Sequence, residues 1–269
     1  MQPNLNLVQR MKRSTFPILS IVAVLVFFYV PIAVLIVNSF NAARFGGNWE
    51  GFTFKWYEKL WHADEIWTAL WTSLKIATLS SLAAMLLGTL AAFALHRFKS
   101  GLQKLHLGAL TVPLVMPDIL MGISLLLFFV ALGVPTGFFT IWIAHVTFCL
   151  SYVAMVVLGR LQDFDFTLIE AARDLGAGRW YAARTVMLPL LAPGIIAGGL
   201  LAFTLSIDDF VITFFVQGAG TTTLPLRVYS MMKVSQNMPM INALSTLLLL
   251  MTFAAVIFSF KLTKNKTSL

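Results

Sequence analysis

Three carboxylates lie inside stretches of sequence that are otherwise strongly apolar. Asp118 follows Pro117 within one such stretch, and Asp208 and Asp209 follow another that begins at Phe203. A charged side chain is costly at membrane depth, so such residues usually face a bundle interior or a wet path. The sequence therefore predicts a pathway for a positively charged species, with at least one of the three carboxylates touching the cargo.

The alternative role for these carboxylates is structural. Asp118 directly follows a proline, where it would cap a half-helix whose N-terminal dipole favours negative charge, and Asp208 would do the same at a break in a later helix. Neighbours on a helix point about 100° apart, so only one of Asp208 and Asp209 is expected to face the path. Asp209 and Asp118 are the favoured contacts with the cargo and Asp208 is the weaker candidate, although spacing alone does not settle which of the adjacent pair faces the path.

Other chemistry finds little support in the sequence. It contains no Gly-x-x-x-x-Gly-Lys-[Ser/Thr] phosphate loop and no His, Cys and Glu cluster at metal-ligand spacing. Cys149 is the single cysteine, so an intrachain disulfide is excluded. His145, alone in an apolar run, is typical of a packed hydrogen-bonding residue. We expect a transport protein with no catalytic residues, no bound metal and no cofactor of its own.

The composition indicates an all-α, polytopic membrane protein. Of 269 residues, 59% are hydrophobic and 11% charged, and the mean hydropathy is +0.85, far from the balance of a soluble domain. The net charge of +8 raises the question of nucleic-acid binding, but the basic residues cluster between apolar runs, where they act as topology signals. We predict one transmembrane domain over residues 1–269 and no nucleic-acid partner.

Six apolar runs are long enough to cross a bilayer. Pro113 and Pro117 interrupt the third, and Ala84, Gly88 and Ala92 place small residues on one face of the second, which suits close helix packing. The predicted spans are 16–38, 68–95, 107–132, 139–159, 190–216 and 241–262.

Lysine and arginine are unevenly distributed between the two sides of this arrangement. The larger set includes Arg10, Lys12 and Arg13 before the first run and Arg97 and Lys99 after the second. The positive-inside rule then places both termini and the segment 160–189 in the cytoplasm.

The cytoplasmic segment 160–189 is predicted to hold a short helix. Thr167 and Glu170 are spaced as a capping box, which would start the helix at Thr167. Gly176 and Gly178 are the residue type that ends a helix in a left-handed conformation. Because so short a helix is marginal alone in water, we expect it to pack on the membrane face or on a partner protein.

The same segment carries a family motif. Glu170-Ala-Ala, then Gly176, then Val186-Met-Leu-Pro189 resembles the cytoplasmic EAA loop of binding-protein-dependent ABC importer permeases; Val186 stands where the family has isoleucine. Four further stretches, which begin at Pro113, Ala144, Phe203 and Ile241, resemble the second permease subunit of spermidine/putrescine transporters.

The resemblance implies a type I ABC importer permease in the bacterial inner membrane that moves polyamines into the cytoplasm. It implies a heterodimer with a related permease, two cytoplasmic ATPase subunits that bind ATP and Mg²⁺, and a periplasmic polyamine-binding protein. Coupling to the ATPase is then expected from residues of the EAA loop, namely Glu170, Ala171, Ala172, Gly176, Leu188 and Pro189.

Two alternatives differ from this in cargo or in energy source. The first is an ABC permease for another small cationic or metal-bound substrate. The second is an ion-coupled secondary transporter whose aspartates carry the ion, but the absence of an inverted sequence repeat argues against it.

Overall fold

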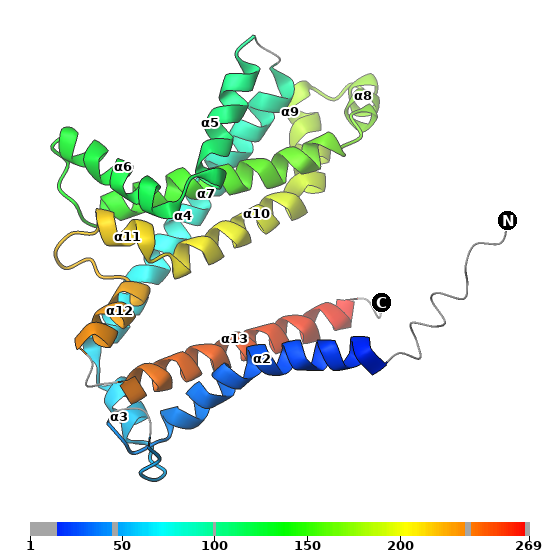
Figure 1. Cartoon of the computed structure of the whole chain (residues 1–269). Helices are drawn as coiled ribbons and strands as arrows, with labels where there is room; N and C mark the ends of the chain where they lie inside the picture. The colour runs from blue at the N-terminus through cyan, green and yellow to red at the C-terminus, as the bar shows by residue number, and fades with distance from the viewer. Residues whose placement is uncertain (1–14, 45–47, 99–100, 235–237, 267–269) are drawn as a thin grey trace. The chain divides into compact units, whose positions relative to one another are not determined.

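The computed structural model describes residues 15–44, 48–98, 101–234 and 238–266, and side chains up to residue 253 in the last range. Arg10, Lys12, Arg13 and Lys99 of the predicted cytoplasmic set lie outside the described residues. The long elements of the described chain are all helices (Figure 1), and one isolated antiparallel bridge joins Asn41 to Phe52. The chain divides into two compact units: Met1–Asp64 with Ser230–Leu269, and Glu65–Tyr229.

The first unit contains two long apolar helices that run antiparallel. These are α2 (Thr15–Ser39) and α13 (Met238–Lys266), with the short helix α3 (Lys55–Trp61) against α13. None of the most apolar part of α2 is buried inside the structure, so this helix offers its surface to lipid or to another protein. Trp56 ties α3 to the preceding segment, because its buried Nε1–H donates a hydrogen bond to the backbone carbonyl of Asn41 at 2.7 Å.

The second unit is built on the 34-residue helix α4 (Asp64–Arg97). At 1.5 Å per residue this helix is about 50 Å long, which exceeds the hydrocarbon thickness of about 30 Å. Its predicted small-residue face is confirmed: Ala84 and Ala92 are fully buried, and a Cβ on Gly88 would lie 2.9 Å from the carbonyl oxygen of Leu150.

Helices α7 (Phe138–Gln162) and α10 (Leu188–Asp208) form the centre of this unit. They approach closely, since a Cβ on Gly198 of α10 would lie 3.3 Å from a methyl carbon of Val153 on α7. The Cys149 thiol is buried at this contact and donates to the carbonyl of Ala202 at 3.4 Å. The core of the unit is therefore the seam between these two helices.

The predicted interruption of the third span is confirmed. The chain forms α5 (Gln103–Val115) and α6 (Asp118–Ala131), which are bent by 113° at a break at Met116 and Pro117. Pro113 lies inside α5 instead of at the break. A continuous span over 107–132 is thus replaced by two helices, because the residue before Pro117 is extended, as the residue before a proline tends to be.

The fifth predicted span, 190–216, also divides. Helix α10 ends at Asp208, Asp209 is extended, and a six-residue helix α11 (Val211–Val216) follows. Helix α12 (Leu224–Val234) comes next in the chain. The chemical reason for the break is the Asp209 side chain, whose contacts are described below.

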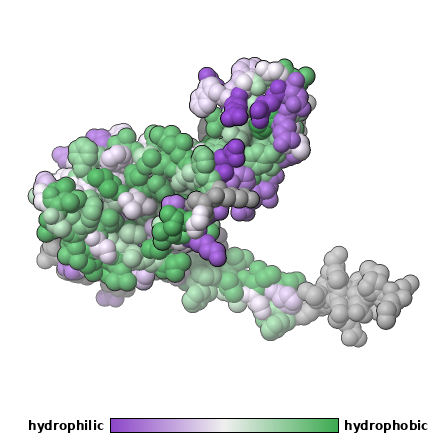
Figure 2. All heavy atoms as spheres, turned by 90° about the horizontal axis from the view of Figure 1, so that it is seen from above, coloured by the Kyte–Doolittle hydropathy of each residue, from purple (hydrophilic) through white to green (hydrophobic). Residues whose placement is uncertain are grey.

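The apolar helices confirm a polytopic, all-helical membrane protein. Four described helices are long and apolar enough to cross a membrane, or five if the bent pair α5 and α6 counts as one span. In α13, the apolar part with described side chains, Met238–Phe253, is shorter than a span. Hydrophobic residues cover much of the visible surface (Figure 2), as expected where lipid or other membrane subunits are the neighbours.

Candidate functional site

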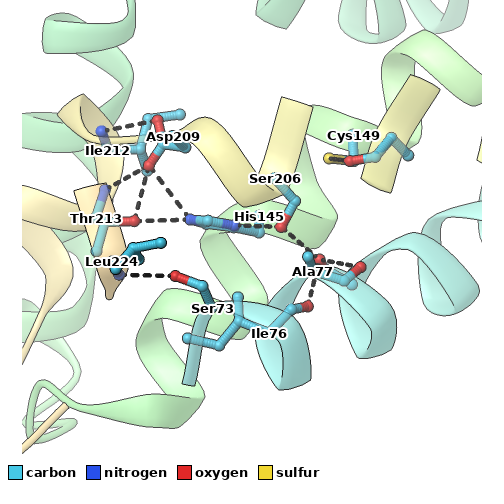
Figure 3. A network of polar contacts seen from close by, with 12 residues as sticks. Ser73, Ile76, Ala77, His145, Cys149, Ser206, Asp209, Ile212, Thr213 and Leu224 are labelled. Carbon is cyan, nitrogen blue, oxygen red and sulfur yellow. Dashed lines mark hydrogen bonds and ion pairs between the residues drawn. The ribbon is translucent and has the colours of Figure 1, made fainter. Parts of the chain in front are cut away.

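Asp209 lies in the break between α10 and α11, and hydrogen-bond donors surround its carboxylate (Figure 3). Its Oδ2 accepts from the N–H and the hydroxyl of Thr213, each at 2.8 Å, and its Oδ1 accepts from the N–H of Ile212 at 3.3 Å. His145 Nε2 lies 3.3 Å from Oδ2, and only 8% of the Asp209 side chain is exposed. A carboxylate in this position caps the following helix, so Asp209 sets the direction in which α11 begins.

His145, on α7, is linked by hydrogen bonds to α10 and α11 and, through Ser206, to α4. Its Nδ1 lies 2.7 Å from the hydroxyl of Ser206 on α10, and its Nε2 lies 2.9 Å from the hydroxyl of Thr213 on α11. The Ser206 hydroxyl is also 2.9 Å from that of Ser80 on α4. The predicted role of His145 as a packed hydrogen-bonding residue is confirmed. Since all of these groups are buried or nearly so, the network locks α4, α7, α10 and α11 together.

Asp208 and Asp118 stand in contrast to Asp209, because both side chains are exposed. Asp208 is the last residue of α10, and Asp118 is the first residue of α6, directly after the N-cap Pro117. In the described part of the chain, neither forms an ion pair. The position of Asp118 agrees with the capping alternative as far as the helix dipole is concerned, but its side chain makes no capping hydrogen bond at this helix start.

The two helices that follow the breaks, α6 and α11, pack on each other. Gly122 of α6 permits this approach, since a Cβ there would lie 2.6 Å from the ring of Phe215 and 3.4 Å from the Cα of Ile212. Asp118 is one helical turn before Gly122, and the Asp209 cap holds Ile212. The site therefore combines two broken helices, each with an exposed carboxylate at its break.

The hydroxyl partners Ser80, Ser206 and Thr213 were not among the predicted site residues. Thr213 is four residues after Asp209, a spacing that suits a side-chain contact on a helix. The sequence could therefore have indicated this partner. Ser80 and Ser206 are separated by well over a hundred residues and could be found only from the tertiary fold. Across the residues that the structure covers, no three His, Cys, Asp or Glu side chains gather as a metal site.

The segment 160–189, which is predicted to be cytoplasmic, contains α8 (Thr167–Asp174), but the predicted capping box is wrong. Thr167 is already helical, and Phe166 before it makes no side-chain cap. Instead Asp165 Oδ1 accepts from the N–H of Thr167 at 3.0 Å and from its hydroxyl at 2.7 Å. These bonds hold the pKa of Asp165 below its usual value. In a capping box the Glu170 carboxylate would accept from the N–H of Thr167, but Asp165 takes that N–H and Glu170 is exposed.

Gly176 ends α8 in the left-handed region, as predicted, with φ of +89°. Gly178 does not: its φ is −64° and ψ 157°, and it precedes the short helix α9 (Arg179–Ala182). A π-helical turn, Ala183–Met187, then leads into α10. A hollow of about 550 Å³ lies between α8 and the start of α9.

The predicted coupling residues lie along this segment and are mostly exposed. Glu170 and Ala171 are exposed on α8, Ala172 is half-buried, and Leu188 and Pro189 are exposed at the start of α10. Two large apolar side chains between them are also open: Leu175 is 90% exposed and Trp180 is 80% exposed. Such side chains mark a surface that another protein or the lipid covers.

Comparison with known protein families gives a match over residues 84–264 to the binding-protein-dependent transport system inner membrane component. The chain belongs to this family. Membership confirms the prediction drawn from the EAA segment, and with it a multi-pass inner-membrane permease that serves transport and is not an enzyme.

Relatives of this permease cover nearly its whole length. It is 44% identical to the spermidine/putrescine transport system permease protein PotC of Escherichia coli (strain K12) over 91% of this chain and 92% of that protein. It is also 44% identical to the putrescine transport system permease protein PotI of the same strain, over 88% of this chain and 86% of that one.

Among solved structures, the permease fold matches a chain of a bacterial ABC transporter involved in the import of the acidic polysaccharide alginate. The TM-score is 0.69, and the match covers 94% of this chain and 97% of the other. At 18% identity this likeness concerns the fold alone. It supports an ABC importer permease architecture for the arrangement of helices described above.

Proposed function

We propose that this permease forms part of the membrane channel of an ATP-driven importer that moves polyamines, spermidine or putrescine, from periplasm to cytoplasm. The observation that carries the proposal is the 44% identity, over nearly the full chain, to permeases named for these two substrates. The chemistry agrees, because polyamines are flexible polycations and exposed carboxylates stand at both helix breaks.

The proposed topology has six spans and cytoplasmic termini, in one transmembrane domain of the type I ABC importer class. Helices α5 and α6 together serve as the third span, and α13, which is 29 residues long, serves as the last. At 1.5 Å per residue, α13 is about 43 Å long and therefore long enough to cross a hydrocarbon core of about 30 Å. The positive-inside distribution of Lys and Arg supports the orientation.

In this proposal the three intramembrane carboxylates have two different roles. Asp118 and Asp208 are exposed and contact the cationic cargo, whereas Asp209 supports the pathway by holding the break in α10 and α11. The spacing along the chain left open which of the adjacent pair faces the path. The 8% exposure of the Asp209 side chain, against the exposed Asp208, favours Asp208.

The proposed partners are a related permease, two cytoplasmic ATPase subunits and a periplasmic polyamine-binding protein. Helix α8, with Glu170, Ala171 and Ala172, would dock on the ATPase. The left-handed Gly176 would then set the return of the chain toward Leu188 and Pro189. Binding of ATP and Mg²⁺ on the ATPase would shift the permease between two states through different contacts at this segment.

The experiment that tests the proposal is uptake of labelled spermidine and putrescine by proteoliposomes that contain the complete importer. We expect uptake only with ATP inside the liposomes and with the binding protein outside. ATP-driven uptake of a different small cation, without polyamine uptake, would replace the cargo in this proposal. Uptake driven by an ion gradient, without ATP, would overturn the importer class.

Neutralising Asp208 is expected to weaken the interaction with the cargo. In Asp208→Asn, the spermidine concentration at half-maximal uptake should rise by roughly tenfold, the loss expected for one charge-assisted contact. The maximal rate should change less, because the carboxamide has nearly the same shape and the side chain is exposed. Initial uptake rates over a range of spermidine concentrations measure both quantities.

The matched control for that prediction is Asp163→Asn, which neutralises an exposed carboxylate at the C-terminal end of α7. The half-maximal concentration should match that of the wild type. An equal rise in both variants would indicate a general effect of surface charge instead of a contact between Asp208 and the polyamine.

A further inference from the structure

Three aromatic rings link the start of α8 to the end of α4. The ring of Phe166 stacks on that of His96, with centroids 5.0 Å apart and planes inclined by 12°. Phe164 makes an edge-to-face contact with Phe166, with centroids 5.0 Å apart and planes inclined by 73°. We call these three side chains the ring relay. Both geometries are among those that aromatic pairs prefer.

Each end of the ring relay is attached to a well-packed part of the second unit. Phe164 packs against the buried core between α7 and α10, next to the fully buried Leu161. His96 belongs to the last turn of α4, whose neighbouring Leu95 is buried. The middle ring, Phe166, is 38% exposed, so its position depends largely on these two ring contacts.

The backbone of Phe166 passes its position on to α8. Its carbonyl oxygen accepts the first bonds of that helix, from the N–H of Ile169 at 3.0 Å and from the N–H of Glu170 at 3.2 Å. Asp165, the residue before it, holds both polar groups of Thr167. The first turn of α8 is therefore fixed to the Phe166 ring through the backbone.

Helix α8 needs such an anchor. It has eight residues, none of them buried, and a helix of this length is marginal without tertiary contacts. Covalent connections carry a movement of α8 to α7 through residues 163–166 and to α10 through α9 and the π-helical turn. The ring relay adds a third route, because it reaches α4, which is distant in the sequence.

We propose that His96 and Phe166 are positioning residues that transmit the movement of α8 to α4, and thereby to the Ser80 end of the buried polar network. This inference rests on the proposed coupling role of α8. It assigns a specific, non-covalent contact to that coupling. Loss of the contact uncouples ATP hydrolysis from transport while α8 still docks on the ATPase, since neither ring belongs to α8 itself: His96 lies in α4 and Phe166 precedes Thr167.

The test measures spermidine uptake and ATP hydrolysis on the same proteoliposomes of the complete importer. For His96→Ala and for Phe166→Ala, uptake per ATP hydrolysed should fall roughly two- to tenfold. Loss of the free energy of one aromatic pair changes an equilibrium by about this factor. His96→Phe retains a ring for stacking and should restore the wild-type ratio. The double variant should be no worse than the single ones, because both remove the same contact.

His106→Ala is the matched control, since it removes an exposed histidine of α5 and should keep the wild-type ratio. The proposal is overturned if His96→Ala keeps the wild-type ratio, or if His96→Phe is as impaired as His96→Ala. Wild-type importer without ATP-driven polyamine uptake would instead refute the proposed cargo. In that case uptake of the cation that the importer does carry, per ATP hydrolysed and with His96→Phe as rescue, decides whether the ring relay acts.

Discussion

Replacing Asp209 by leucine is expected to destabilise the permease strongly. The variant leaves His145 Nε2 and the N–H and hydroxyl of Thr213 without their shared acceptor in a buried site. Removal of one partner of a buried pair costs about 3–5 kcal/mol in soluble proteins, whereas interhelical hydrogen bonds in membranes average about 0.6 kcal/mol, so we expect a loss of about 2 kcal/mol or more. For a chain of this size that corresponds to a melting temperature lower by roughly 5 °C.

Thermal unfolding of the purified permease in detergent measures this loss. Asp208→Leu replaces the neighbouring exposed carboxylate and serves as the matched control. Its free energy of unfolding should lie within about 0.5 kcal/mol of the wild-type value. The variant with both His145→Leu and Asp209→Leu should lose less stability than the sum of the two single losses, because both replacements remove the same contact between His145 and Asp209. Equal destabilisation by Asp208→Leu and Asp209→Leu would contradict the structural role of Asp209.

The membrane class, the helix break near Pro117 and the left-handed Gly176 could be predicted from the sequence because each depends on local chemistry. Apolar runs follow from composition, a proline restricts the residue before it, and glycine is the residue type that tolerates positive φ. The family was predicted from the motif in the segment 160–189.

Other features depend on groups that are far apart in the sequence or that compete locally. The capping box failed because Asp165 accepts the N–H of Thr167, which a capping box would give to Glu170, and spacing alone does not decide between these two acceptors. The contrast between Asp208 and Asp209 depends on His145, which α7 brings to the break. No pattern within residues 203–209 carries that information.

The buried network and the ring relay contact the same helix, α4, at two different places. Ser80 ties the middle of α4 to Ser206 beside the α10 break, and His96 ties the last turn of α4 to Phe166. Because α4 is a single continuous helix between these residues, a displacement at its C-terminal end is carried to the polar network as a rigid-body movement. This geometry gives α8 a mechanical connection to the carboxylate site that does not pass through the π-helical turn.

Replacing Gly176 by valine is expected to abolish most transport while leaving the membrane helices intact. Gly176 has φ of +89°, where a β-branched residue is strained by roughly 1–2 kcal/mol or more. Relief of that strain reorients the chain after α8. The exposed face of α8 then no longer meets the ATPase in register, and uptake should fall by about tenfold or more. Uptake, ATP hydrolysis and co-purification of the ATPase subunits measure the effect.

Gly178→Val separates backbone strain from steric bulk, since the two positions are two residues apart and a Cβ at either would meet no atom within 4 Å. Gly178 has φ of −64° and ψ of 157°, a conformation that valine adopts readily. Gly178→Val should therefore transport nearly as well as the wild type. If both variants lose transport equally, bulk at the docking surface is the cause; if Gly176→Val transports normally, the left-handed turn is not required for coupling.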